Sequence, residues 1–310
     1  MHGQIEYLFI FRPPEVVFNN DKSILDVCLC RYCHNLERII ESSVLSSSDV
    51  FKSFIPPSDK TLKKKHFLKK ILCDVPTREC FMRICTTCRD KKEDLEHEML
   101  EIFESNNIQE ISYELWETTE RSKVVPHCQN YKDFVDMFLS KLEKYSSHKY
   151  EYQTQQKFYD NLKINLPPGK VLIAGDFAEN LSLFEAQEIQ SAYYGKEQVT
   201  IFPAVIHYNV DQKINQVSCV FISDTRHHRA QEVYAFMNVL NKEYLDIIAG
   251  ERTQNIYMSD GAASHFKCRS NLVNLAHHSE DYGVSAEWHF QGTSHGKGNN
   301  GIMKDNYKRL

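Results

Sequence analysis

A short apolar run that ends in a glycine and two carboxylates constrains the fold of this chain more than any other stretch. Residues 171–180 have the sequence VLIAGDFAEN, in which four apolar residues precede Gly175, Asp176 follows directly, and Glu179 comes three positions later. An apolar run of this length, closed by a glycine, is typical of a buried strand. Sheets of such strands keep their chemistry at the strands' carboxyl ends. We therefore expect Asp176 to lie at a functional edge of a sheet.

The pattern recurs in residues 255–267, which have the sequence NIYMSDGAASHFK and place Asp260 after a second strand-like run. Two carboxylates at two strand ends are suitable ligands for a hard divalent cation. Further strands are expected at 198–208, 216–223 and 285–290, and helices at 230–240 and 264–277. Three strands in succession, followed by strands that alternate with helices, predict an α/β fold with a mixed sheet and flanking helices.

A Pro-Pro-Gly sequence at 167–169 marks the clearest boundary in the chain. The part before it is predicted to hold helices at 62–72 and 91–103, a strand at 108–116, and a helix from 131 to 162. These patterns divide the chain into a small, mostly helical, cysteine-rich region at 1–105, a connector of one strand and one helix at 106–168, and the α/β core at 169–310.

Seven of the ten cysteines lie between Cys28 and Cys88. With no targeting signal and no membrane-length apolar stretch, we expect an intracellular protein whose thiols are reduced. Two Cys-x-x-Cys pairs have the spacing of zinc knuckles, which predicts structural zinc (Zn²⁺) in region 1–105. The paired residues are Cys30, Cys33, Cys85 and Cys88, and the further candidate ligands are Cys28, His34, Cys73 and Cys80. Spacing does not decide which four bind, and a run of reduced core cysteines is the alternative.

The overall charge does not indicate a nucleic-acid-binding protein, because the net charge is −5 and the isoelectric point is about 6.3. Binding to DNA would need a local basic patch. Residues 62–72, with the sequence LKKKHFLKKIL, predict an amphipathic helix with a cationic face. That face is interpreted either as a solvated surface or as a phosphate-binding patch.

Five motifs carry a resemblance to a known family. They are VCLCRYCHN at 27–35, CDVPTRECFMRICTTC at 73–88, GDFAENLS at 175–182, SDGAASHFK at 259–267 and YGVSAEWHFQGTSHGKG at 282–298, of which the last is the most specific. Over residues 12–310 the chain resembles DDE-type transposase-like proteins found in animal genomes. The resemblance implies an RNase H-like core, preceded by an N-terminal Cys/His zinc-binding region.

The resemblance also implies a polynucleotidyl transferase, which hydrolyses phosphodiester bonds and transfers DNA strands with two Mg²⁺ or Mn²⁺ ions. In such a site Asp176 would bridge the two ions and Asp260 would be the second ligand. Lys267, His295 and Lys297 are the expected contacts to nucleic-acid phosphates.

A third acidic ligand is expected on the helix after the last strand, shortly after the HGKG sequence at 295–298. This chain has Asn300 and Gly301 at that place, and neither side chain carries a negative charge. Glu287 on the last strand is taken as the third catalytic residue, and Asp305, about one helical turn late, is the other candidate. Because the chain stops at residue 310, where that helix would be under way, we also expect a core truncated at its C-terminus.

Two functions follow from these features. The first is a metal-dependent DNA nuclease and strand transferase, placed in the nucleus by its substrate and expected to act as a homo-oligomer by family analogy. The alternative is a catalytically inactive DNA-binding or protein-interaction module of transposon origin, because the third acid is not evident. Neither function involves a membrane.

Overall fold

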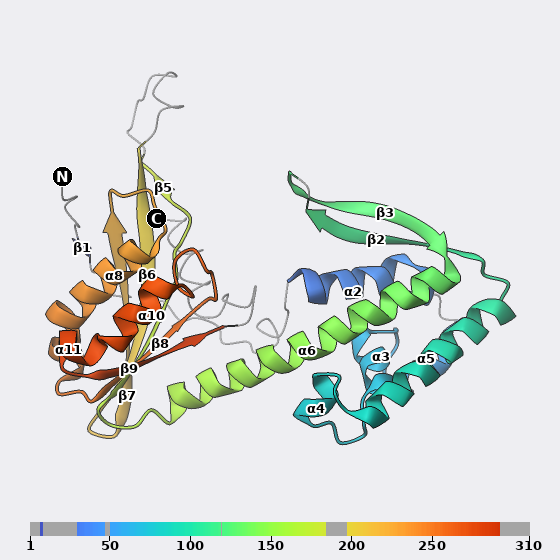
Figure 1. Cartoon of the computed structure of the whole chain (residues 1–310), viewed down its shortest axis with the longest axis horizontal. Coiled ribbons are helices and arrows are strands. Elements are labelled where there is room, and N and C mark those ends of the chain that lie inside the picture. Colours follow the sequence, from blue (N-terminus) through green and yellow to red (C-terminus); the bar gives the residue numbers. More distant parts are fainter. Residues whose placement is uncertain (1–6, 9–29, 47–49, 119, 184–196, 292–310) are drawn as a thin grey trace. The chain divides into compact units, whose positions relative to one another are not determined.

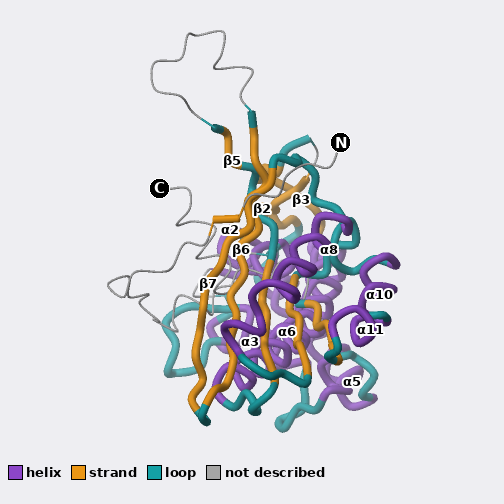
Figure 2. The backbone as a smooth tube through the Cα atoms, turned by 90° about the vertical axis from the view of Figure 1, so that its left-hand side faces the viewer, coloured by secondary structure: helices purple, strands orange, loops and turns teal. Residues whose placement is uncertain are grey.

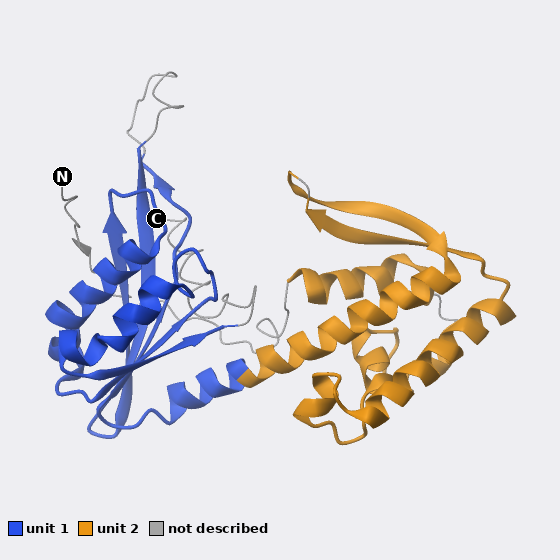
Figure 3. Cartoon of the chain, in the orientation of Figure 1, with its two compact units in different colours: residues 1–25, 155–310 blue, residues 26–154 orange. Residues whose placement is uncertain are grey.

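The chain forms two compact units in the computed structural model, which describes residues 7–8, 30–46, 50–118, 120–183 and 197–291. The cysteine-rich unit is Asp26–Thr154, and the sheet unit is Gln155–Leu310 together with Met1–Leu25 (Figure 3). Helix α6 (Tyr131–Ile164) supplies residues to both units. Within the described ranges, no helix combines the length and the apolarity needed to cross a membrane.

The sheet unit is built on one mixed, seven-stranded sheet with the order β1-β7-β6-β4-β8-β9, in which β5 also pairs with β6 (Figures 1 and 2). β6 is antiparallel to both β4 and β7, whereas β8 runs parallel to both β4 and β9. The strands are β1 (Tyr7–Leu8), β4 (Lys170–Gly175), β5 (Leu181–Ser182), β6 (Gln198–Val210), β7 (Lys213–Ser223), β8 (Gln254–Ser259) and β9 (Ser285–Phe290). The predicted mixed α/β sheet is confirmed.

Both faces of β4 are buried, because its residues alternate between two cores. Val171 and Ile173 belong to the core that also contains Phe236 of helix α8 (Ala230–Val239). Leu172 belongs to a smaller core with Tyr159 of α6. Strands that are buried on both faces have the near-continuous apolar sequence seen here. The other helices of the unit are α9 (Leu245–Ala249), α10 (Arg269–Ala276) and α11 (His278–Tyr282), and a π-helical turn, Leu240–Tyr244, joins α8 to α9.

The cysteine-rich unit packs helices, a hairpin and the first part of α6 around a phenylalanine-rich core. The fully buried side chains of this core include Phe51, Phe67, Phe103, Phe134 and Phe138. The elements are α2 (Arg31–Ser42), α3 (Lys64–Ile71), α4 (Arg78–Phe81), α5 (Thr86–Ser105), β2 (Glu110–Thr118) and β3 (Ser122–Asn130), with short 3₁₀ turns at Val44–Ser46 and Lys52–Phe54. The helices predicted at 62–72, 91–103 and 131–162 are present as α3, α5 and α6.

The boundary between the two units falls within the predicted connector, because residues 106–154 belong to the cysteine-rich unit and residues 155–168 to the sheet unit. The hairpin at the start of this stretch is hydrogen-bonded to α2. The side-chain amide of Asn35 on α2 donates to the carbonyl of Trp116 on β2 at 3.0 Å and accepts from its N–H at 2.8 Å. Strand β3 was not predicted from the sequence, because Pro126 interrupts it and apolar alternation is weak. Proline is tolerated there because β3 has a neighbouring strand on only one side.

Candidate functional site

The two aspartates of the sequence motifs meet at one edge of the sheet. β4 and β8 are parallel neighbours, with Ala174 opposite Met258. Asp176 comes two residues after Ala174, and Asp260 comes two residues after Met258. Oxygen atoms of Asp176 and Asp260 and a ring nitrogen of His265 all lie within 4.8 Å of one another. The structure therefore brings together the predicted carboxylates and adds an imidazole to them.

Asp176 is held at the end of β4 by close packing around the residue that precedes it. Its side chain is buried, and its N–H donates to the carbonyl of Pro203 on β6 at 3.3 Å. A Cβ atom at Gly175 would lie 2.8 Å from the ring of Phe202, which is fully buried. Glycine is required at that position because the Phe202 ring occupies the space of a side chain.

Asp260 and His265 are positioned by a compact turn after β8. The N–H of Ala262 donates to Oδ1 of Asp260 at 3.0 Å, and the Ala262 carbonyl accepts from the N–H groups of Phe266 and Lys267 at 2.9 and 3.0 Å. The helix expected at 264–277 begins only at Arg269, as α10, because this turn occupies its first residues.

The His265 ring is fixed in its orientation by an aromatic contact and a hydrogen bond. It lies nearly perpendicular to the Phe177 ring, with the centroids 5.1 Å apart. Its Nδ1 atom is 2.8 Å from Oγ of Ser264, and its Nε2 atom is 3.9 Å from Oδ1 of Asp260. If Nδ1–H donates to the hydroxyl, Nε2 is left as a free ligand atom beside the carboxylates. Sequence reasoning did not identify this candidate ligand, although it lies within the SDGAASHFK motif.

The third predicted acid lies away from this cluster. β9 pairs with β8 so that Glu287 is opposite Ile256, four residues before Asp260 and so about 13 Å back along the strand. Glu287 instead lies beside His289, whose Nε2 is 3.3 Å from its Oε1. Lys267 lies in the turn after Asp260, with Nζ 5.8 Å from the centroid of the Phe290 ring. His295, Lys297 and Asp305 lie outside the described residues.

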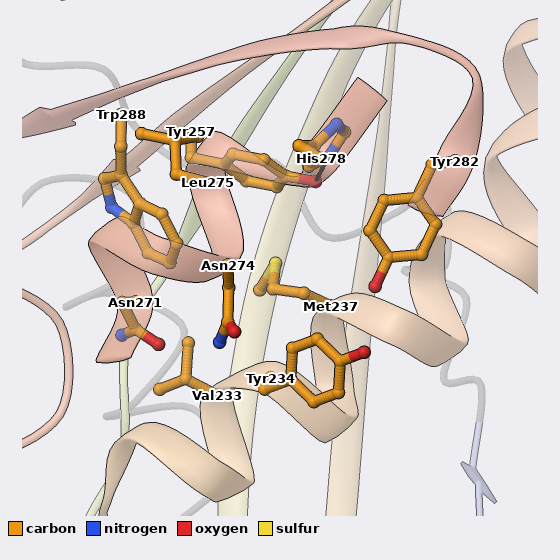
Figure 4. Close-up of a pocket in the computed structure, with 10 residues that line it drawn as sticks. All are labelled: Val233, Tyr234, Met237, Tyr257, Asn271, Asn274, Leu275, His278, Tyr282 and Trp288. Carbon is orange, nitrogen blue, oxygen red and sulfur yellow. Dashed lines mark hydrogen bonds between the residues drawn. The ribbon is translucent and has the colours of Figure 1, made fainter. Parts of the chain in front are cut away.

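The sheet unit also contains an apolar pocket, whose lining includes neither aspartate (Figure 4). Tyr234 of α8 and Tyr282 of α11 converge there with Tyr257 and Trp288 of the sheet. Burial lowers the pKa of His278, which donates from Nδ1 to the Val284 carbonyl at 2.8 Å. Nε2 of this neutral ring therefore accepts from the Tyr257 hydroxyl at 2.9 Å. With these groups already paired, the pocket offers apolar surface rather than a reactive group.

Four thiols of the cysteine-rich unit form a second cluster. Sγ of Cys73, Cys80, Cys85 and Cys88 all lie within 4.8 Å of one another, and Cys73 is 3.9 Å from Cys85 and 3.6 Å from Cys88. Tetrahedral zinc–thiolate bonds of about 2.3 Å would separate the sulfurs by about 3.8 Å, whereas a disulfide needs about 2.05 Å. The four cysteines are free, so they form a thiol donor set that could hold a metal.

The surroundings of this thiol cluster affect its members differently. Hydrogen bonds from Thr77 lower the pKa of Cys80 to about 6, whereas burial raises the pKa of Cys88 to about 12. A bound divalent cation would supply the positive charge that lets all four thiols deprotonate together. Arg83 secures the loops by donating to the carbonyls of Ile71 and Cys88, each at 2.9 Å.

The other cysteine pair of the sequence lies in a separate, third cluster. Cys30 and Cys33 group with His148 of α6, and their ligand atoms lie within 4.8 Å of one another. His148 was not identified from the sequence, because no short spacing links it to the cysteines. His34 belongs to neither cysteine cluster and instead lies edge-on to Trp116, with the ring centroids 6.1 Å apart. Cys28 lies outside the described residues.

Three of the four lysines of α3 have acidic partners. Lys64 lies 3.2 Å from Glu37, and Lys70 lies 2.7 Å from Glu98. Lys65 lies 2.6 Å from Asp59, which lowers the pKa of that carboxyl to about 2 together with the neighbouring His66. These pairs favour the interpretation of the α3 face as a solvated surface.

Comparison with known families follows the division into units. Residues 155–310 match the model of a domain of unknown function, DUF8701, and residues 34–146 match a second domain of unknown function, DUF8700. No curated protein and no solved structure matches the chain. Because the first match covers just over half of the 310 residues, the chain belongs to the DUF8701 family.

Proposed function

We propose that the sheet unit is an RNase H-like core of DDE-type transposase descent, which binds a divalent cation and acts on DNA phosphodiester bonds. The observation that carries the proposal is the meeting of Asp176 and Asp260 at the ends of adjacent parallel strands. The strand arrangement also supports it. β4, β6 and β7 are antiparallel neighbours in the sheet, β8 runs parallel to β4, and the two acids follow β4 and β8.

The donor set fits a small divalent cation. Carboxylate oxygens suit Mg²⁺ and Mn²⁺, and the His265 nitrogen shifts the preference toward Mn²⁺, because Mg²⁺ favours oxygen ligands. When bound, such a cation polarises a phosphodiester and neutralises developing charge. Asp176 and Asp260 would hold it, and the ring contact with Phe177 would keep His265 in place. These three ligand atoms suffice for one cation, and a second would need further ligands.

A catalytically inactive DNA-binding or protein-interaction module is the second candidate. It is favoured by the identity of the third ligand, which in the described part of the chain is His265 rather than a carboxylate. The pairing of β8 with β9 also favours the inactive module. It places Glu287 opposite Ile256, four residues before Asp260, and so away from the two aspartates.

The cluster of Cys73, Cys80, Cys85 and Cys88 is proposed as a metal site that stabilises the fold and takes no part in catalysis. Zinc is the cation that best matches four thiols at these separations. In this proposal zinc stabilises the cysteine-rich unit, DNA is the partner, the protein acts in the nucleus, and the active form is a homo-oligomer.

A nicking assay tests the proposed activity. Full-length protein with Mn²⁺ should nick supercoiled DNA, and Asp176→Asn should abolish the nicking. Asp211→Asn is a matched control, because Asp211 lies exposed in the β6–β7 turn at φ 53°, which asparagine also adopts. Salt-sensitive DNA binding without nicking, unchanged by Asp176→Asn, would instead support the inactive module.

A further inference from the structure

Cys30, Cys33 and His148 form a compact group of buried ligand atoms at the beginning and the end of the cysteine-rich unit. Their side chains are almost completely buried. Sγ of Cys30 lies 3.0 Å from Nε2 of His148, although 118 positions separate the two residues. The three ligand atoms lie within 4.8 Å of one another.

The local structure at the start of α2 prepares the two sulfurs to bind a cation. Cys30 is the N-cap residue, and its Sγ accepts the N–H of Cys33 at 3.3 Å. The N-terminus of a helix carries partial positive charge, which favours the thiolate over the thiol. A Cys-x-x-Cys pair that begins a helix therefore presents two sulfurs to one ion in the manner of a zinc knuckle.

The imidazole comes from α6, far from the cysteines in sequence but adjacent in the fold. The ring of Tyr32 lies beside that of His148, with the centroids 5.3 Å apart. A tetrahedral zinc ion would hold a thiolate sulfur and an imidazole nitrogen about 3.6 Å apart. The 3.0 Å separation of Cys30 and His148 would thus have to open by only about half an ångström, which side-chain rotation supplies.

We infer that Cys30, Cys33 and His148 bind a second zinc ion, separate from the ion at the four-thiol cluster, and that this ion joins α2 to α6. The inference is independent of any activity at Asp176 and Asp260. Zinc is preferred to Mg²⁺ or Ca²⁺, because two sulfurs and one nitrogen are a borderline-soft donor set. It is preferred to a disulfide, because neither cysteine is in a disulfide and a Cys30–Cys33 bond would not use the nitrogen of His148, which lies 3.0 Å from Sγ of Cys30.

The order of the ligands along the chain gives this ion a specific role. Cys30 and His148 lie near the two ends of the unit Asp26–Thr154, and the whole four-thiol cluster lies between them in sequence. Closing a loop of this length removes much of the conformational freedom of the unfolded chain. The ion at Cys30, Cys33 and His148 therefore connects the beginning of the unit to its end, whereas the ion at the four-thiol cluster connects the short loops around α4.

Zinc stoichiometry of the full-length protein tests the inference. An Asp176→Asn background removes the contribution of the carboxylate cluster, and zinc is measured by atomic emission after dialysis against a weak chelator. Two ions per chain are expected in this background. His148→Ala and Cys73→Ser should each lower the content to one ion, and the combined variant should lose both. A background content of one ion that His148→Ala does not change would overturn the inference.

A ligand exchange and a matched control exclude a purely structural effect of the substitution. His148→Cys supplies a thiolate in place of the imidazole and should retain two ions, whereas His148→Ala should not. His97→Ala, an exposed histidine on α5, should also retain two. If His148→Cys binds only one ion although it is folded by circular dichroism, residue 148 is not a ligand and the inference fails.

Discussion

Replacement of Gly175 by alanine tests how the fold holds Asp176 in place. The added Cβ would lie 2.8 Å from two ring carbons of Phe202, whereas carbon atoms pack best at about 3.5–4.0 Å. Phe202 cannot move away, because it is fully buried and packs against Phe177 and Phe236, with centroids 5.1 and 5.2 Å away. Overpacking of this kind costs about 1–3 kcal/mol, and alanine recovers about 0.4–1 kcal/mol through the unfolded chain. We therefore expect a net loss in the free energy of unfolding centred at about 1 kcal/mol and not above about 2.6 kcal/mol.

Urea unfolding followed by tryptophan fluorescence measures this loss. The chain has two tryptophans, so a Trp116→Phe background leaves Trp288, in the sheet unit, as the reporter. Phe202→Leu should relieve the contact, which makes the double variant with Gly175→Ala more stable than the sum of the single effects by about 1 kcal/mol.

Gly261→Ala is the control for the loss of a glycine, because the nearest atom to its added Cβ is 3.6 Å away, an ordinary contact. A Gly175→Ala effect no larger than that of Gly261→Ala would refute the steric explanation. A double variant whose effect equals the sum of its parts would refute it as well.

Three further perturbations test other parts of the structure. Burial lowers the pKa of His207 to about 4, so below pH 6.5 the unfolded chain takes up a proton that the folded chain does not. Stability should fall by up to about 3 kcal/mol from pH 6.5 to pH 4 in urea titrations, and His207→Leu should flatten that dependence; an unchanged slope would contradict the assignment. The buried Arg252 donates to the side chain and the carbonyl of Asn241 at 3.0 and 2.9 Å. Arg252→Met should therefore lower the free energy of unfolding by about 1–3 kcal/mol for each acceptor left unpaired, whereas the exposed Lys242→Met should lower it much less. Cys88→Ser should remove one zinc ion and lower the melting temperature of the cysteine-rich unit, whereas the exposed Cys128→Ser should do neither.

The sequence predicted the carboxylate pair because the information was local. Each aspartate directly follows a short apolar run, and a strand that delivers one carboxylate to a sheet edge can be recognised without its neighbours. The parallel pairing of β4 and β8 then places Asp176 and Asp260 together. The sequence also showed Gly175 at the end of the first run. The reason for glycine at that position is the ring of Phe202 on β6, and this contact between two strands could not be predicted from the sequence.

The candidate ligands that the sequence did not predict, His265 and His148, depend on contacts between residues that no sequence spacing indicates. His265 becomes a neighbour of Asp260 only because residues 260–268 form a turn, where the helical periodicity of 264–277 predicted a helix. His148 lies 118 positions from Cys30 on the helix α6, whose existence was predicted but whose packing on α2 was not. Glu287 was selected for its charge, and only the β8–β9 register shows its distance from the aspartates.

The distribution of the cysteines over two clusters was also not predictable from the sequence. Both Cys-x-x-Cys pairs have the spacing of zinc knuckles. That spacing is sufficient to expect metal binding, but it does not show which other residues bind the same ion as each pair. The structure groups Cys85 and Cys88 with Cys73 and Cys80, while Cys30 takes a histidine partner. The grouping depends on the packing of the whole unit, because the same buried core contains the phenylalanines and Cys30, Cys33, Cys80 and Cys88.

Titration of the full-length protein with Mn²⁺, followed by electron paramagnetic resonance, tests the central claim most directly. The account predicts saturable binding that Asp176→Asn and Asp260→Asn abolish, that His265→Ala weakens, and that Glu287→Gln leaves unchanged. Absence of saturable binding, or binding that persists in Asp176→Asn but disappears in Glu287→Gln, would contradict the proposed site.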